Sequence, residues 1–111
     1  AACHWAWRDL LPLFGVEVDE GRVCRDGNVI TGGGVTAGLD FALVAGAEIF
    51  GEDAARRVQL GLEYSPAPPF VGGRPEEASP HILEQVRRVM DMAAADRLAA
   101  AQEAARRLRT R

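Results

Sequence analysis

The first residues of the sequence place a thiol beside an imidazole, at Cys3 and His4. Such a pair can convert the thiol to a thiolate, which is the nucleophilic form of cysteine. If this segment is extended, however, neighbouring side chains point to opposite faces, so the two groups diverge. A small, buried, unreactive thiol is then the favoured role for Cys3, and catalysis is the alternative.

A second candidate site is the run Thr-Gly-Gly-Gly-Val-Thr-Ala-Gly, which extends from Thr31 to Gly38. Glycine amides at the start of a helix can bind a phosphate group. The run has neither the lysine of a phosphate-binding P-loop nor the glycine spacing of a dinucleotide-binding motif, which disfavours nucleotide binding. A tight turn with close backbone packing and a loop that lines a pocket both stay open.

Composition argues against several other kinds of function. The chain has 111 residues, enough for one domain, with two cysteines and two histidines. Cys3 and Cys24 lack the close spacing of a structural zinc site, so no metal is expected, and Cys24 is expected to be structural. A formal net charge of −3 disfavours nucleic acid as a partner. No apolar run is long enough for a membrane span and none resembles a secretory signal, so we expect a cytoplasmic protein.

Hydrophobic patterning predicts the elements that position the amino-terminal candidates. Residues 1–14 predict a strand end followed by a short helix that stops at Gly15. Two turn signals within an alternating pattern predict three short strands, with a hairpin turn at Asp26-Gly27-Asn28. Those strands are expected at 16–18, 22–25 and 28–31.

Helical spacing of apolar residues dominates the rest of the chain. It predicts a mostly buried helix from 35 to 50 that stops at Gly51, and a second helix over 52–62. Prolines then predict an extended loop from 65 to 77.

The last predicted element is one helix over 79–109, with Ser79 as its N-cap, Pro80 in its first turn and His81 at the surface. At 1.5 Å per residue, about 30 residues would span about 45 Å. Beyond residue 97 the helix either frays in solvent or docks onto another subunit or onto sequence outside this chain. Its apolar stripe comprises Ile82, Val86, Val89, Ala93, Leu98, Ala101, Ala105 and Leu108.

Four segments, in this order and with natural spacing, carry a family resemblance. They read A-C-H-W-A from Ala2, V-C-R-D-G-N from Val23, I-T-G-G-G-V-T-A-G-L-D from Ile30 and Q-L-G-L-E-Y-S-P-A-P-P-F from Gln59. Over nearly the whole chain, the sequence resembles the C-terminal half of the bacterial isocyanide hydratases of the ThiJ/PfpI family.

The resemblance implies an α/β fold, a flavodoxin-like three-layer sandwich related to the class I glutamine amidotransferases and usually homodimeric. Residues 1–111 would be the C-terminal portion of one such domain, supplying late strands, a hairpin and the long terminal helix 79–109. In this family, a cysteine at a sharp strand-to-helix turn attacks the carbon of a small-molecule isocyanide. An N-substituted formamide is released without metal or organic cofactor, and a carboxylate assists proton transfer.

The resemblance also assigns the candidate residues. The family has a threonine where Cys3 stands, which argues against a catalytic Cys3, whereas His4 matches an accessory histidine near the nucleophile. The matched nucleophile and acid would lie in an N-terminal half, so we expect this chain to be part of a longer polypeptide and inactive by itself. The substrate-binding loop and helix start, which shape the pocket, match Gly33, Gly34, Val35 and Thr36.

Other functions remain as alternatives. The amidotransferase-like sensor domain of AraC-type transcription regulators carries related T-H-W and T-x-x-G-x-T-A-G-x-D segments. Those chains continue into a helix-turn-helix DNA reader, whereas this sequence runs through the proline loop into a helix. A noncatalytic dimerisation half, docking a partner through the Ala/Leu stripe, is the third possibility. For the full enzyme, a glyoxal or another electrophilic carbon is an alternative substrate.

Overall fold

The structure is a computed structural model that describes residues 1–110. The chain forms two compact units. Unit 1 comprises Ala1–His4 and Asp19–Pro69, and unit 2 comprises Trp5–Val18 and the described part of Phe70–Arg111. Both candidate sites of the sequence, around His4 and around the glycine run, therefore lie in unit 1.

Unit 1 is built on a hairpin of two antiparallel strands, β1 (Val23–Asp26) and β2 (Val29–Gly32). Val23 pairs with Gly32 at the open end, and Asp26 pairs with Val29 at the turn. Gly27 lies in the turn with φ +59°, a conformation that glycine adopts without steric cost. The predicted hairpin is confirmed to within one residue at each strand.

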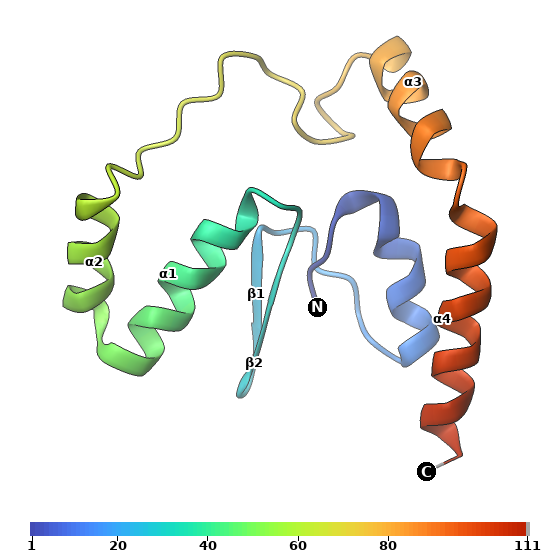
Figure 1. Ribbon diagram of the computed structural model, residues 1–111, viewed down its shortest axis with the longest axis horizontal. Helices are drawn as coiled ribbons and strands as arrows, with labels where there is room; N and C mark the ends of the chain where they lie inside the picture. Colours follow the sequence, from blue (N-terminus) through green and yellow to red (C-terminus); the bar gives the residue numbers. More distant parts are fainter. Residues whose placement is uncertain (111) are drawn as a thin grey trace. The chain divides into compact units, whose positions relative to one another are not determined.

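Two helices follow the hairpin, α1 (Ala37–Phe50) and α2 (Glu52–Gly61), and they lie side by side in Figure 1. Both predicted helices are confirmed. Glu52 and Asp53 occupy the first turn of α2, where acidic side chains interact favourably with the helix dipole.

Gly51 separates the two helices at φ +89° and ψ 156°, a region of the backbone map that is almost restricted to glycine. We expect Gly51→Ala to lower the free energy of unfolding by about 1–3 kcal/mol. Gly46→Ala is the matched control, because position 46 lies within α1 and an added Cβ meets nothing within 4 Å. That control should stabilise by about 0.5–1 kcal/mol. Urea unfolding followed by circular dichroism measures the free energy of unfolding of both variants. Equal effects of the two substitutions would contradict a specific requirement for glycine at position 51.

The expectation that α1 is mostly buried is wrong for this chain. Ala37 is its one buried residue, whereas Ile49 and Phe50 are 70% and 76% exposed. The hairpin and α2 cover only part of the helix surface, so a helix that is apolar nearly all round keeps apolar side chains in solvent.

Unit 2 contains η1 (Trp5–Phe14, a 3-10 helix), α3 (Pro80–Asp91) and α4 (Ala94–Arg109). The predicted early helix and its stop are confirmed, since Gly15 follows η1 with φ +71°. Helix α4 packs on η1, where the Arg97 guanidinium lies 3.6 Å from the centre of the Trp7 ring. Ala105 of α4 is 2% exposed. Helix α4 is thus docked within unit 2 and does not extend into solvent as a free helix.

The single helix expected over 79–109 is wrong: it is divided into α3 and α4 by Met92 and Ala93 (Figure 1). Ala93 adopts φ −116° and ψ 14°, outside the helical region, and its carbonyl then accepts from the Arg97 N–H at 3.1 Å. The apolar stripe is therefore not continuous. Ser79 precedes Pro80 as expected, but its side chain makes no capping hydrogen bond.

Strands predicted at the amino terminus and at 16–18 are also wrong, since both segments are irregular. Two backbone hydrogen bonds hold the amino terminus and the residue after this second segment. The Ala2 N–H donates to Thr31 Oγ1 at 2.9 Å, and the Asp19 N–H donates to the Ala1 carbonyl at 2.8 Å. Across residues 1–110, β1 and β2 form the one sheet, and the predicted loop over 65–77 contains no helix or strand.

Within that described range, no helix combines the length and the apolar character needed to cross a lipid bilayer.

Candidate functional site

His4 and the glycine run lie against each other in unit 1, although 30 positions separate them in the sequence. A Cβ built at Gly34 would lie 3.0 Å from His4 Cδ2, tighter than about nine in ten Cβ contacts in real structures. Glycine at position 34 thus permits the imidazole to approach the loop backbone. This close approach, together with the Ala2–Thr31 hydrogen bond, fixes the first residues of the chain beside the loop.

The loop is held by backbone hydrogen bonds on both sides. The Gly33 N–H donates to the Arg22 carbonyl at 2.8 Å, just before β1 begins. The Ala37 N–H donates to the Gly34 carbonyl at 2.9 Å, which starts α1. An added Cβ at Gly33 would lie 3.5 Å from both the Arg22 carbonyl oxygen and Ala37 Cβ, which is ordinary van der Waals contact. The two backbone hydrogen bonds thus attach the loop to the segment before β1 at one end and to the start of α1 at the other.

The two remaining candidates differ in their surroundings. Val35 is 96% exposed, so its side chain packs against little within the chain. Thr36 Oγ1 accepts a hydrogen bond from Arg22 Nη1 at 3.3 Å. The structure therefore brings together His4, Gly33 and Gly34, links Thr36 to them through Arg22, and leaves Val35 in solvent.

A cluster that the sequence analysis did not nominate lies next to Thr36. Asp40, in the first turn of α1, accepts hydrogen bonds from Arg22 Nε and from the Tyr64 hydroxyl. The three residues come from the segment before β1, from α1 and from the chain after α2. Asp40 and Tyr64 both lie within the family-like segments, but no sequence spacing indicates that they meet.

This pairing changes how the cluster ionises. The hydroxyl of Tyr64, and next the guanidinium of Arg22, lower the pKa of Asp40 below its usual value. The same bond to Asp40 raises the pKa of the Tyr64 phenol, because the neighbouring carboxylate favours the neutral donor. Asp40 therefore remains a carboxylate, and Tyr64 remains a hydrogen-bond donor, throughout the neutral range.

A titration tests this assignment. Because the folded pKa of Asp40 is depressed, its ionisation stabilises the fold above its ordinary pKa of 3.8, and this stabilisation is lost as the pH falls through the lower folded value. Tyr64→Phe should move the Asp40 midpoint back toward 3.8, as followed by carboxyl-carbon NMR. Asp53→Asn, on the exposed start of α2, is the control and should leave that midpoint in place. An unchanged midpoint in Tyr64→Phe would contradict the assignment.

An open cavity of about 710 Å³ adjoins this cluster. Polar groups line one part of it and the proline-rich segment lines another, so a small molecule there would meet hydrogen-bonding and apolar surfaces together. The lining residues are Arg22, Thr36, Leu39, Asp40, Tyr64, Pro66, Ala67 and Pro68.

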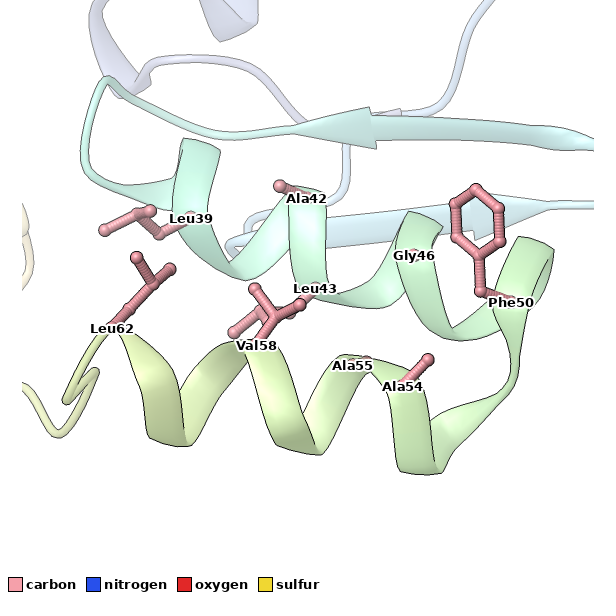
Figure 2. A pocket seen from close by; sticks show the side chains of 9 residues that line it. All are labelled: Leu39, Ala42, Leu43, Gly46, Phe50, Ala54, Ala55, Val58 and Leu62. Atoms are coloured by element: carbon pink, nitrogen blue, oxygen red, sulfur yellow. The ribbon is translucent and has the colours of Figure 1, made fainter.

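A second cavity, of about 380 Å³, lies between α1 and α2 and is shown in Figure 2. Its side chains carry no polar group, so it offers no chemistry. We interpret it as an incompletely filled helix interface. Its lining consists of Leu39, Ala42, Leu43, Gly46, Phe50, Ala54, Ala55, Val58 and Leu62.

Neither cysteine is placed as a nucleophile at a strand-to-helix turn. Cys3 Sγ donates to the backbone carbonyl of His4 at 3.4 Å, and Cys24 lies within β1. Both cysteines are half-buried, and His81 is exposed in α3. No three potential metal ligands among His, Cys, Asp and Glu lie together in the part of the chain that the structure describes.

The chain resembles known proteins. No family model matches the sequence. The chain is 44% identical to a ThiJ/PfpI family protein from Pseudomonas syringae of known crystal structure, with a TM-score of 0.74 over 94% of this chain and 42% of that one. At this level of identity, the chain shares its α/β fold with a ThiJ/PfpI protein, and the resemblance to that family is confirmed.

Another relative is named as an enzyme. The chain is 51% identical over 88 residues to the isonitrile hydratase of Pseudomonas putida. The match covers 79% of this chain and 39% of the hydratase. The chain thus spans about two fifths of the length of both relatives, and the resemblance to isocyanide hydratases is confirmed at that extent.

Proposed function

We propose that the chain is the C-terminal part of an isocyanide hydratase, built on a flavodoxin-like three-layer sandwich. It would supply one wall of the substrate pocket, while the nucleophilic cysteine and the acid come from the remainder of the domain. The observation that carries the proposal is the 51% identity to the isonitrile hydratase of Pseudomonas putida. The contact between His4 and Gly34 supports it, because it joins two segments of the family resemblance at one place.

The proposed reaction adds water to an isocyanide. A thiolate attacks the terminal isocyanide carbon, and the same carbon takes up a proton to give a thioimidate. Water then adds its oxygen to this carbon while the nitrogen takes up a proton. Loss of the hydroxyl proton and cleavage of the carbon–sulfur bond return the thiolate and release the N-substituted formamide. All atoms of the isocyanide and of one water molecule are found in the product, so no oxidant or cofactor is required.

The residues of this chain would act around the reacting carbon. His4 would orient or tune the thiolate of the complete site, because an imidazole beside a thiol favours its ionised form. Gly33 and Gly34 would let the substrate approach the backbone, and Thr36 would begin the helix that borders the pocket. A homodimer is part of the same proposal, as the family resemblance implies.

Replacement of the matching two fifths of the Pseudomonas putida enzyme by this chain tests the proposal. The chimera should convert an isocyanide to its formamide at a rate within about tenfold of the parent enzyme, which corresponds to a change of about 1.4 kcal/mol or less in the barrier. A chimera that folds and dimerises like the parent but produces no formamide would contradict it.

A further inference from the structure

We propose that Arg22 is a positioning residue for the substrate pocket and holds the loop Gly33–Thr36 (the glycine loop) in place against His4. The inference rests on the proposed function, since it assigns a role at the pocket proposed there. Arg22 stands just before β1 and belongs to none of the residues that the family resemblance assigns to the site.

Arg22 contacts both ends of the glycine loop. Its backbone carbonyl accepts from the Gly33 N–H at 2.8 Å, which fixes the loop where it leaves β2. Its side chain donates through Nη1 to Thr36 Oγ1 at 3.3 Å, and through Nε to Asp40, which fixes the start of α1. The loop between these two attachments carries Gly34, against which the His4 ring lies.

The planar guanidinium is what permits two of these contacts at once. Nε and Nη1 lie in one rigid plane, so one side chain bonds Asp40 and Thr36 in a fixed relative geometry. A lysine offers one compact ammonium on a flexible stem and can retain the charge pairing with Asp40 without fixing Thr36. Arg22→Lys is therefore expected to preserve the ion pair while losing the control of the loop.

The same strand region provides a matched control for an ordinary surface ion pair. Arg25 in β1 pairs with Glu48 of α1, as Arg22 pairs with Asp40. The two arginine side chains are equally exposed, at 52% and 54%. Arg25 bonds no atom of the glycine loop, its other acceptor being the Gly27 carbonyl in the hairpin turn.

The test is amide hydrogen exchange, resolved by NMR, in the full chain and in four variants: Arg22→Met, Arg22→Lys, Arg25→Met and Arg25→Lys. The reporters are the Gly33 and Ala37 amides, which are hydrogen-bonded at the two sides of the loop, together with the His4 ring signals. The Cys24 amide reports on global opening, because Cys24 and Thr31 form a hydrogen-bonded pair in the middle of the hairpin. We expect Arg22→Met and Arg22→Lys each to speed exchange at Gly33 and Ala37 by about tenfold relative to Cys24, and to shift the His4 ring signals. Both Arg25 variants should leave these ratios unchanged.

Three results would overturn the proposal: full rescue of the loop by Arg22→Lys, equal effects of the Arg22 and Arg25 variants, or faster exchange spread equally over hairpin and loop. The exchange measurement requires no isocyanide, so it tests the role of Arg22 separately from the proposed hydratase function. An inactive chimera with the expected exchange pattern would remove the proposed function alone, and an active chimera whose loop is insensitive to Arg22 would remove this inference alone.

Discussion

Incubation of an isocyanide with the 111-residue chain alone should give no N-substituted formamide above the uncatalysed rate. Covalent catalysis needs a thiolate at the reacting carbon, and this chain offers only two cysteines. The Cys3 thiol donates to a backbone carbonyl and Cys24 lies within a strand, so neither is presented to a pocket in the way the reaction requires. In the chimera with the remainder of the hydratase, the same residues should support turnover. The difference in formamide production between the isolated chain and the chimera is therefore the largest effect that we expect.

Two cysteine variants test whether either thiol of this chain takes part in the reaction. In the chimera, Cys3→Ser and Cys24→Ser should retain formamide production to within about threefold, because a half-buried structural thiol contributes packing and not bond making. Formamide production by the isolated chain, if abolished by Cys3→Ser, would show instead that Cys3 is the nucleophile. Product is measured by mass spectrometry against a chain-free control.

His4→Ala should carry the second large effect, a loss of about hundredfold in kcat/KM of the chimera, at the low end of what a residue that orients or exchanges a proton contributes. Gly34→Ala should act through the same imidazole, because the added Cβ would lie 3.0 Å from Cδ2 and the ring must move. A displacement of several tenths of an ångström near a reacting group predicts a loss of about tenfold.

Gly38→Ala is the matched control for Gly34→Ala. It lies four residues further along, in the first turn of α1, and an added Cβ there meets nothing within 4 Å. Its activity should equal that of the unmodified chimera. If Gly34→Ala and Gly38→Ala behave alike, His4 has no part in the pocket and the contact is a packing detail of the fold.

Local signals predicted much of the fold. The Asp26-Gly27-Asn28 turn and the glycine at position 51 determine backbone geometry within a few residues, and both turn out where the sequence places them. The division at Met92 and Ala93 could not be predicted in this way. Alanine has a high helix propensity, so the residue type at position 93 does not predict the end of a helix. Helix α4 packs on η1, a contact between parts of the chain that are distant in sequence, and local propensity does not report such a contact.

The sequence likewise predicted one part of the candidate site and missed another. His4 and Gly34 were named through the family resemblance, and the structure brings them together. The cluster of Arg22, Asp40 and Tyr64 was missed, because three residues from three elements acquire a shared role only when the chain is folded. A periodic pattern shows which face of a helix is apolar, but it does not show which carboxylate on that helix meets a tyrosine 24 positions later.

The most direct test of the central claim is turnover of an isocyanide by the chimera in isotopically labelled water. If this chain forms a wall of a hydratase pocket, the N-substituted formamide should carry the labelled oxygen, and its production should stop when the cysteine that we propose as the nucleophile, in the Pseudomonas putida portion, is replaced by serine. A folded chimera that leaves the isocyanide unchanged, or a product without label, would contradict the assignment of this chain to an isocyanide hydratase.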